Sequence, residues 1–373
     1  MPEPTPDQSL HLPSLVIKNF RGIDELTIPR LGRVTLLVGK NGVGKTTVLD
    51  AVRIWATRGH RFDIAEVLHD RDEVIHSPDE QGKEVALANW DGLFFGRRVH
   101  SDETILIGPD DEADFLQMRI VALDENEISN VERRQSVHFD DEEILALRVK
   151  FRGAARTLLP HGISVSMRMR RRSSGASSNQ EIFCARLGPD VPDNETIEQY
   201  LNALILTPDE ERAIEALNLV ADSPAERVAL VDSGTRIGPR AGRRSIVKLN
   251  GQDTPVPLRS LGDGAVRSFA IALTLAASTD GFLLIDEAEN GIHHSIQAKF
   301  WNMVLQTAER NNVQVIATTH SWDCVVGFAK AANELADVEG VLYRIQRNRE
   351  RLSAVEYPES ELEIAAEHHI EVR

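Results

Sequence analysis

The sequence predicts an α/β protein with a mixed, largely parallel central sheet and an inserted α+β lobe. Two observations carry this prediction. From Gly262 onward, apolar strand-like runs alternate with helical segments of roughly 10 to 15 residues, and such alternation is typical of parallel strands joined by helical crossovers. Earlier in the chain, Val34 to Val38 is an almost continuous apolar run, which is the pattern of a parallel strand buried on both faces.

Residues 1–60 are expected to form the first part of the main domain. Leu15 to Asn19 and Glu25 to Ile28 are rich in strand-forming residues, and the apolar run from Val34 follows them. A glycine-rich turn comes next. From Thr46 to Trp55 the apolar residues then recur at helical spacing, so the sequence predicts three strands and one helix in this part.

Residues 61–225 are interpreted as the inserted lobe, because acidic loops here separate short strand-like segments. The expected strands are Thr104 to Ile107, Leu116 to Leu123, Ile144 to Phe151, Ile163 to Met169 and Glu181 to Ala185. Helical spacing predicts two helices after them, Glu195 to Leu206 and Pro208 to Leu219.

The main domain is expected to resume over residues 226–347, and residues 348–373 are interpreted as a C-terminal tail. The expected strands are Arg227 to Val231, Ser245 to Leu249, Phe282 to Ile285, Val313 to Ala317 and Val341 to Ile345. The expected helices are Gly262 to Ala277, Ser295 to Ala308 and Trp322 to Ala332. The chain shows no long heptad run, so no coiled-coil arm is expected.

Composition limits the class of protein. A chain of 373 residues with 42% hydrophobic and 27% charged residues fits a globular protein and not a disordered, collagen-like or disulfide-rich one. Its longest apolar runs, such as Phe269 to Ala277, fall far short of the roughly 20 residues that a membrane helix needs. The N-terminus also lacks the basic and apolar parts of a signal peptide. A cytoplasmic protein without membrane contact is expected.

The net charge of −16, from 58 acidic and 42 basic residues, argues against a surface that coats nucleic acid. Eight of the basic residues are lysine and the others are arginine, a preference that reflects either genome composition or phosphate-binding sites. Two arginine clusters are equally consistent with DNA contact and with solvated loops. Their members are Arg168, Arg170, Arg171 and Arg172, and Arg236, Arg240, Arg243 and Arg244.

A phosphate-binding loop comes after the apolar run at Val34 to Val38. Its pattern is Gly-Lys-Asn-Gly-Val-Gly-Lys-Thr from Gly39, in which glycines let successive backbone N–H groups and a helix N-terminus point at phosphate oxygens. Lys45 adds a cation for the β- and γ-phosphates, and the Thr46 hydroxyl can ligate magnesium. The candidate nucleotide-binding residues here are Gly39, Asn41, Gly42, Gly44, Lys45, Thr46 and Thr47.

Two carboxylates end the apolar strand Phe282 to Ile285. Asp286 is expected to hold the magnesium ion together with Thr46, and Glu287 is expected to polarise the water that attacks the γ-phosphate. A solvated acidic turn at a strand end is the alternative. An earlier phosphate loop in the same chain favours the catalytic interpretation, in which Glu287 and Lys45 are catalytic residues.

Two further elements are also candidates for contact with phosphate. His320 comes directly after the strand Val313 to Ala317 and its threonines, at the edge where ligands bind in parallel sheets. It is a candidate catalytic residue that contacts the γ-phosphate, and a hydrogen-bonded histidine at a helix start is the alternative. Ser260, Gly262, Asp263 and Gly264 open a long apolar helix, and a serine and glycines at a helix start form an anion site. A plain glycine turn with a helix cap is the alternative for this second element.

The ordered set of these motifs resembles the ABC-type ATPases of the SMC, RecF and OLD (overcoming lysogenization defect) groups. The similarity also includes Lys18-Asn-Phe-Arg-Gly22, and the phrase Asp286-Glu-Ala-Glu-Asn-Gly-Ile-His-His294 with Ala317-Thr-Thr-His-Ser321 is most similar to OLD-like AAA family ATPases. The resemblance covers roughly residues 14 to 60 and 226 to 347. It implies an ABC-type P-loop ATPase head that uses ATP and Mg²⁺.

The resemblance also implies a head-to-tail homodimer in which two ATP molecules lie between the subunits, with Ser260 to Gly264 of one subunit completing the site of the other. The chain departs from the family pattern in two places. The usual Leu-Ser-Gly-Gly order appears as Ser-Leu-Gly-Asp-Gly, which leaves open which residue acts as the signature serine. The glutamine that links magnesium to the lobe is not evident, and Gln117 is a candidate for it.

The residues after His320 can be compared with the corresponding part of OLD nucleases. OLD nucleases carry a Toprim nuclease domain there, and the remaining residues of this chain are too few for one. We therefore expect a stand-alone ATPase that regulates a separate Toprim-type nuclease, another effector or a DNA-processing partner in anti-phage defence. The alternatives are a RecF-like DNA repair ATPase and a slow ATP-dependent clamp with little turnover.

No metal site is assigned to the adjacent histidines of the chain. The pairs His293 and His294, and His368 and His369, lack the spacing of a metal site.

Overall fold

The computed structural model of the chain describes residues 10–78, 84–97, 103–123, 145–159, 181–221, 223–232, 243–348 and 351–357. Within these ranges the predicted α/β fold class is confirmed. The central sheet has the strand order β10-β14-β15-β3-β16-β17, and all of its neighbouring pairs are parallel except β16 and β17. Its strands are β3 (Val34–Val38), β10 (Cys184–Leu187), β14 (Phe282–Ile285), β15 (Gln314–Thr319), β16 (Gly340–Asn348) and β17 (Arg351–Tyr357).

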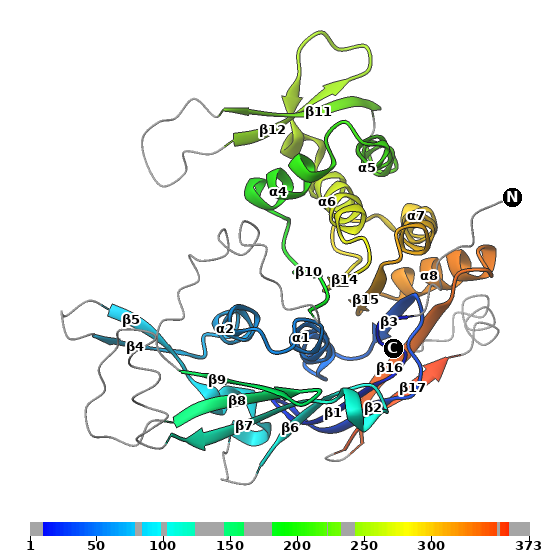
Figure 1. Cartoon of the computed structure of the whole chain (residues 1–373). Helices are drawn as coiled ribbons and strands as arrows, with labels where there is room; N and C mark the ends of the chain where they lie inside the picture. The colour runs from blue at the N-terminus through cyan, green and yellow to red at the C-terminus, as the bar shows by residue number, and fades with distance from the viewer. Residues whose placement is uncertain are drawn as a thin grey trace, which may run out of the picture.

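Helices cover both faces of this sheet, as Figure 1 shows. On one face lie α6 (Asp263–Ala277), α7 (Gln297–Arg310) and α8 (Trp322–Glu334), and on the other lies α1 (Lys45–Ala56). Strand alternation divides the side chains between two cores. Leu36 and Leu283 pack into the core shared with α6 to α8, whereas Leu37 packs into the core shared with α1. The apolar run at Val34 to Val38 is therefore buried on both faces, as predicted.

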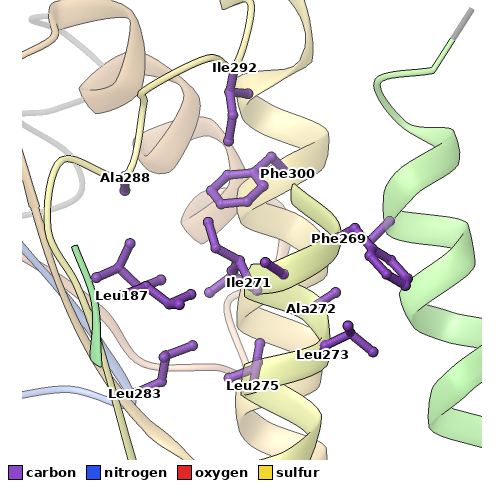
Figure 2. Close-up of a cluster of buried hydrophobic side chains, with 14 of the residues drawn as sticks. Leu187, Phe269, Ile271, Ala272, Leu273, Leu275, Leu283, Ala288, Ile292 and Phe300 are labelled. Carbon is purple, nitrogen blue, oxygen red and sulfur yellow. The ribbon is translucent and has the colours of Figure 1, made fainter. Parts of the chain in front are cut away.

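Figure 2 shows the first of these cores around α6. Phe269 and Ile271 project from the helix, Leu283 comes from the neighbouring strand β14, and Phe300 comes from α7. All four side chains are 0 to 1% exposed. Ile271 and Leu283 pack α6 against the sheet, whereas Phe269 lies on the side of α6 that faces a green helix. The signature-like residues Ser260 to Gly264 lie at the N-terminal end of α6.

A second, antiparallel sheet lies beyond α1 and has the order β2-β1-β6-β7-β8-β9. Its first two strands come from the N-terminal part of the chain and the other four from the segment interpreted as a lobe. The bounds are β1 (Leu15–Phe20), β2 (Ile23–Ile28), β6 (Ile105–Gly108), β7 (Leu116–Ala122), β8 (Leu145–Phe151) and β9 (Ala154–Leu158).

The described residues also form two small sheets, three further α-helices and several 3-10 turns. They include a hairpin of β4 (Val74–Pro78) and β5 (Glu84–Ala88), and a small sheet of β11 (Ala225–Asp232), β12 (Arg243–Leu249) and β13 (Val256–Pro257). The further α-helices are α2 (Arg61–His69), α4 (Asn194–Leu204) and α5 (Pro208–Asn218). The 3-10 turns are η1 (Trp90–Leu93), η2 (Phe95–Arg97), η3 (Glu112–Asp114), η5 (Leu258–Leu261) and η6 (His294–Ile296).

The pairing of strands shows how residues 61–225 relate to the rest. β10, expected as a lobe strand at Glu181 to Ala185, pairs in parallel with β14 of the central sheet, and β6 pairs with β1. Helix α2 was not predicted. The strand expected at Ile163 to Met169 lies outside the described residues. Strands of this segment thus complete both large sheets, although the domain boundaries themselves stay a prediction. No helix in the described ranges is long and apolar enough to cross a membrane.

Candidate nucleotide site

The phosphate loop joins β3 to α1 through three glycines with positive φ. Gly39, Gly42 and Gly44 have φ of 148°, 73° and 116°, values that residues with a Cβ rarely adopt. A Cβ at Gly39 would also overlap the carbonyl oxygen of Ile345. No side chain caps the first turn of α1, so its backbone N–H groups are left for an anion. Asn41 and Thr47 lie in this loop and first turn with the other predicted residues.

Lys45 is buried beneath this loop, with 8% of its surface exposed. Its Nζ donates to the carbonyl oxygens of Gly39 at 2.6 Å and Lys40 at 3.2 Å. Burial lowers the pKa of Lys45, and the charges of Asp286, Glu289 and Glu287 act in the opposite direction. The cation is therefore held inside the loop in the position from which phosphate oxygens would be bound.

Asp286 and Thr46 meet at the carboxyl edge of the sheet. The parallel registers of β14, β15 and β3 align the ends of these strands. As a result, the Thr46 hydroxyl lies 3.2 Å from Asp286 Oδ1, and the Thr318 hydroxyl donates to the same oxygen at 2.5 Å. A hydroxyl and a carboxylate suit Mg²⁺, which takes few protein ligands and completes its octahedron with water and phosphate. Among the described residues, no group of three or more His, Cys, Asp or Glu side chains could hold a metal.

Glu287 has a backbone in the left-handed region, with φ of 50°. Its backbone N–H donates to the Thr318 hydroxyl at 2.9 Å, and its Oε2 accepts from Asn290 Nδ2 at 2.8 Å. The side chain is 36% exposed. A carboxylate that is fixed in place and still open to solvent can accept a proton from a bound water, which is the role that the sequence predicts.

His320 comes after β15 and lies beside these carboxylates. Its Nδ1 lies 3.1 Å from Oε1 of Glu289 and 3.8 Å from Oε1 of Glu287, and its backbone N–H donates to Glu289 Oε1 at 2.9 Å. The ring is 43% exposed, whereas the Glu289 side chain is 8% exposed. Sequence reasoning missed Glu289 as a site residue, although it lies in the quoted Asp-Glu-Ala-Glu phrase. Its spacing of three residues from Asp286 was the available signal.

The signature-like residues lie at the start of α6. Gly262 has φ of 91° and precedes the helix, whose first turn has no side-chain cap. The Ser260 hydroxyl donates to the Pro257 carbonyl at 2.6 Å and does not cap α6. Ser260, Gly262 and Asp263 are exposed, whereas Gly264 is buried against the backbone of Gly291. Among the described hydrogen bonds and ion pairs, none joins these residues to the phosphate loop.

Arg267 was missed by sequence reasoning and connects α6 to the site. Its side chain is among the largest fully buried ones. One guanidinium nitrogen donates to the carbonyl oxygens of Asp286 at 2.7 Å and Glu287 at 2.9 Å. Burial lowers the pKa of Arg267, and the charges of Glu289, Asp286 and Glu287 oppose this shift. No motif in the sequence signals this contact.

Arg186 is a second arginine that sequence reasoning missed. It lies on β10, and its nitrogens are 3.4 Å from Asp50 Oδ1 and 2.9 Å from Asp70 Oδ2. A third distance, 3.9 Å, separates it from Oδ2 of Asp286. Arg186 thereby joins the end of β14 to α1 and to the residue after α2. The pairing of β10 with β14 brings it here, and that pairing was not predictable from the local pattern.

The sequence also singled out Gln117, two arginine clusters and two histidine pairs. Gln117 lies on β7 with an exposed side chain and a position opposite Leu106 and Lys150 in the antiparallel sheet. Arg243 is 3.5 Å from Glu198, so one member of the second arginine cluster is paired with a carboxylate. The rings of His293 and His294 lie 4.1 Å apart on the surface. Arg168, Arg170, Arg171, Arg172, Arg236, Arg240, His368 and His369 lie outside the described residues.

Residues 34–323 match the family described as "AAA domain, putative AbiEii toxin, Type IV TA system". The chain belongs to this AAA-domain family. The match includes the phosphate loop, the acidic end of β14 and His320. It confirms the ATPase-type domain that the motifs predict, whereas membership of the OLD-like group stays a prediction.

Two proteins of Methanocaldococcus jannaschii are also similar to the chain. Uncharacterized protein MJECL11 is 34% identical over 92 residues, which are 25% of this chain and 80% of that protein. Uncharacterized protein MJECL10 is 38% identical over 48 residues, which are 13% of this chain and 22% of that protein.

Among solved structures, the chain is similar to SMC head domains. The SMC head domain from Thermotoga maritima has 14% identity and a TM-score of 0.44, and the alignment covers 94% of this chain and 100% of that one. The Smc head domain with an extended coiled coil, bound to the C-terminal domain of ScpA derived from Pyrococcus furiosus, has 12% identity and a TM-score of 0.47. That alignment covers 96% and 99% of the two chains.

Proposed function

We propose that this AAA-family chain binds ATP with Mg²⁺ and hydrolyses it. The observation that carries the proposal is the 3.2 Å distance between the Thr46 hydroxyl and Asp286 Oδ1. It places the end of the phosphate loop beside the acidic end of β14, which is the arrangement that P-loop ATPases use to hold a nucleotide-bound magnesium ion. Glu287 and His320 lie at the same edge of the sheet.

Each residue then has a defined task. Lys45 and the N–H groups of the phosphate loop hold the phosphates, and Thr46 with Asp286 holds Mg²⁺. Bound ATP would supply the phosphoryl group, and Mg²⁺ would neutralise part of its negative charge. Glu287 accepts a proton from the attacking water, and His320 donates a hydrogen bond to the γ-phosphate. Catalysis of this kind depends on positioning, and the buried contacts around Asp286 supply it.

The test is phosphate release with and without Mg²⁺ for the wild type, Lys45→Ala and Glu287→Gln. Lys45→Ala is expected to abolish nucleotide binding measured with a fluorescent ATP analogue. Glu287→Gln is expected to keep binding and to slow single-turnover hydrolysis by about 100-fold or more, as removal of a general base does. A wild type that releases no phosphate, or a Glu287→Gln variant as fast as wild type, would contradict the proposal.

We also propose that ATP joins two copies of the chain, with Ser260 to Gly264 of one copy completing the site of the other. The support is that no side chain caps the first turn of α6 and that Ser260, Gly262 and Asp263 at its start are exposed, where an anion from outside could approach the helix N-terminus. Sedimentation of Glu287→Gln with ATP and Mg²⁺ is expected to show a dimer. Gly262→Val, which cannot adopt φ of 91° without strain, is expected to remain monomeric, and a Gly262→Val dimer would contradict the model of shared sites.

The partner of the ATPase is proposed to be a separate effector chain, either a nuclease or a DNA-processing protein, in a cytoplasmic defence system. The family description, which names a toxin and a type IV toxin–antitoxin system, supports a role with a second component. Co-purification of the chain with the product of a neighbouring gene, with and without ATP, tests this. A replication or recombination protein as the ATP-dependent partner would favour the repair function instead.

A further inference from the structure

Arg267 makes an unusual set of hydrogen bonds for a single side chain. Its Nη2 donates to the carbonyl oxygens of Asp286 at 2.7 Å and Glu287 at 2.9 Å. Its Nη1 donates to three carbonyl oxygens in the segment after β10, at distances between 2.9 and 3.0 Å, and these belong to Gly188, Pro189 and Asp190. The guanidinium therefore connects the backbone after β14 with the backbone after β10.

The backbone of Glu287 needs such support. Its φ of 50° lies in the left-handed region, which a residue with a long side chain adopts only when its surroundings hold it there. The Thr318 hydroxyl accepts from its N–H at 2.9 Å, and Arg267 donates to its carbonyl oxygen. These two contacts act on the two sides of Glu287, so together they set the direction in which its side chain leaves the strand end.

The carboxylate of Glu287 is linked to the same assembly. Asn290 Nδ2 donates to Glu287 Oε2 at 2.8 Å and lies 3.1 Å from the Pro189 carbonyl oxygen. Arg267 donates to that same Pro189 oxygen. A shift of the segment after β10 would therefore move Asn290 and Glu287 together, and Arg267 is a buried side chain that is hydrogen-bonded to both segments.

From this geometry we infer that Arg267 is a positioning residue for the water-activating Glu287, an inference that rests on the proposed ATPase function. Arg267 acts through the backbone, because its described contacts are to carbonyl oxygens. A planar guanidinium has donors on two separate nitrogens, which here reach the two segments, whereas a lysine ammonium is a single point of contact. The alternative is a purely structural arginine that stabilises the fold without affecting the reaction.

The experiment compares Arg267→Lys and Arg267→Gln with Arg33→Lys. Arg33 is a matched control, because it is 3% exposed and pairs with Glu309 at 3.1 Å, directly before β3 and so at the opposite end of the strand from the phosphate loop. Both Arg267 variants are expected to slow single-turnover hydrolysis at saturating ATP by about 10- to 100-fold, the effect of a small misplacement of a catalytic group. Their dissociation constants for a fluorescent ATP analogue are expected to stay within about twofold of wild type. Arg33→Lys is expected to hydrolyse ATP at the wild-type rate, whatever its thermal midpoint.

A double variant separates positioning from stability. If Arg267 acts through Glu287, then Arg267→Lys should cause no further loss in the Glu287→Gln background, because residues that act as a unit are not additive. Equal fold losses in both backgrounds would overturn the inference. So would wild-type hydrolysis by Arg267→Lys, or loss of nucleotide binding and of folding in both Arg267 variants, which is the result of a purely structural role. Failure of the proposed function is distinguishable, since it appears as a wild type without hydrolysis or as no effect of Glu287→Gln alone.

Discussion

The carboxyl edge of the central sheet and the exposed turn before α6 both carry sequence motifs for phosphate, but they are built differently. At the sheet edge, Asp286 is 6% exposed and Lys45 is 8% exposed, and the Asp286 carboxylate accepts hydrogen bonds from Thr46 and Thr318. At the turn, Ser260 and Asp263 are exposed, and the helix start has no side-chain cap. The first region is organised by side-chain contacts within one chain, whereas no side chain caps the helix start in the second.

This difference predicts how substitutions act. A change at the sheet edge should disturb chemistry in an isolated chain, because positioning contacts are already formed there. A change to an exposed side chain in the turn should be nearly silent in an isolated chain and should appear only when two copies meet. Four substitutions test that contrast, from the largest expected effect to the smallest.

Asp286→Ala is expected to have the largest effect. It removes the carboxylate that accepts from Thr46 and Thr318 and with it the proposed magnesium ligand. Mg²⁺-dependent phosphate release should fall by about 1000-fold or more, since metal ions neutralise much of the charge in phosphoryl transfer. Asp280→Asn is the control, because Asp280 lies exposed at the opposite end of β14 and hydrogen-bonds Asn312. Equal activity of the two variants would contradict the assignment of Asp286.

Gly264→Ala should destabilise the protein, because a Cβ there would overlap the Gly291 carbonyl oxygen at the contact between α6 and the loop after β14. Overpacking of this kind costs about 1 to 3 kcal/mol in the free energy of unfolding. Gly262→Ala is the matched variant, since nothing lies within 4 Å of its Cβ position and only its φ of 91° opposes the change. Its φ of 91° and ψ of 159° lie in a region that almost only glycine adopts, and this strain should cost about 1 to 3 kcal/mol. Urea unfolding measures both losses, and a Gly264→Ala variant as stable as the wild type would refute the close contact.

Glu289→Gln should slow hydrolysis by about tenfold while leaving the fold intact. Glutamine keeps an oxygen that can accept from the His320 backbone N–H, but it removes the negative charge that lies 3.1 Å from His320 Nδ1. The measurement is the single-turnover rate at saturating ATP. Glu334→Gln, which changes an exposed carboxylate bound by Asn302, should hydrolyse ATP at the wild-type rate. A Glu289→Gln rate equal to that control would mean that Glu289 does not orient His320.

Ser260→Ala should have the smallest effect on an isolated chain. The exposed hydroxyl loses one hydrogen bond to the Pro257 carbonyl, and the free energy of unfolding should change by less than about 0.5 kcal/mol, as for most surface substitutions. If the turn completes the site of a second copy, ATP-dependent dimerisation should weaken although stability does not. A dimer of unchanged affinity would assign the contact to the N–H groups of α6 and not to this hydroxyl.

Local pattern predicted most of the elements near the site. The helical spacing after Gly44, the apolar run of β14 and the strand before His320 all appear in the structure within a few residues of their expected bounds. These segments were predictable because the period of apolar residues reflects which face is buried. Helix α2 was missed, because its residues Arg61 to His69 include buried charged groups, Asp63 and Glu66, that interrupt an apolar pattern.

The motif residues were also predictable, whereas their supporting contacts were not. Glycine at positive φ, a lysine after it and carboxylates at a strand end are local requirements of phosphate and magnesium chemistry, so Gly39 to Thr46 and Asp286 to Glu287 could be named from the sequence. Arg267 and Arg186 have no such signature. Arg267 donates to backbone carbonyl groups. Because every residue has a carbonyl group, the residue types of its partners do not reveal the contact.

The sequence by itself thus determined most of the strands and helices around the site, the phosphate loop and the acidic strand end, since each depends on neighbouring residues along the chain. Tertiary structure alone decided that β10 pairs with β14 and that β6 pairs with β1. It also decided that Arg267 holds the backbone of Glu287 and that the turn before α6 is left exposed. The physical reason is that pairing of strands and burial of an arginine depend on surfaces brought together from distant parts of the chain, which no local pattern encodes.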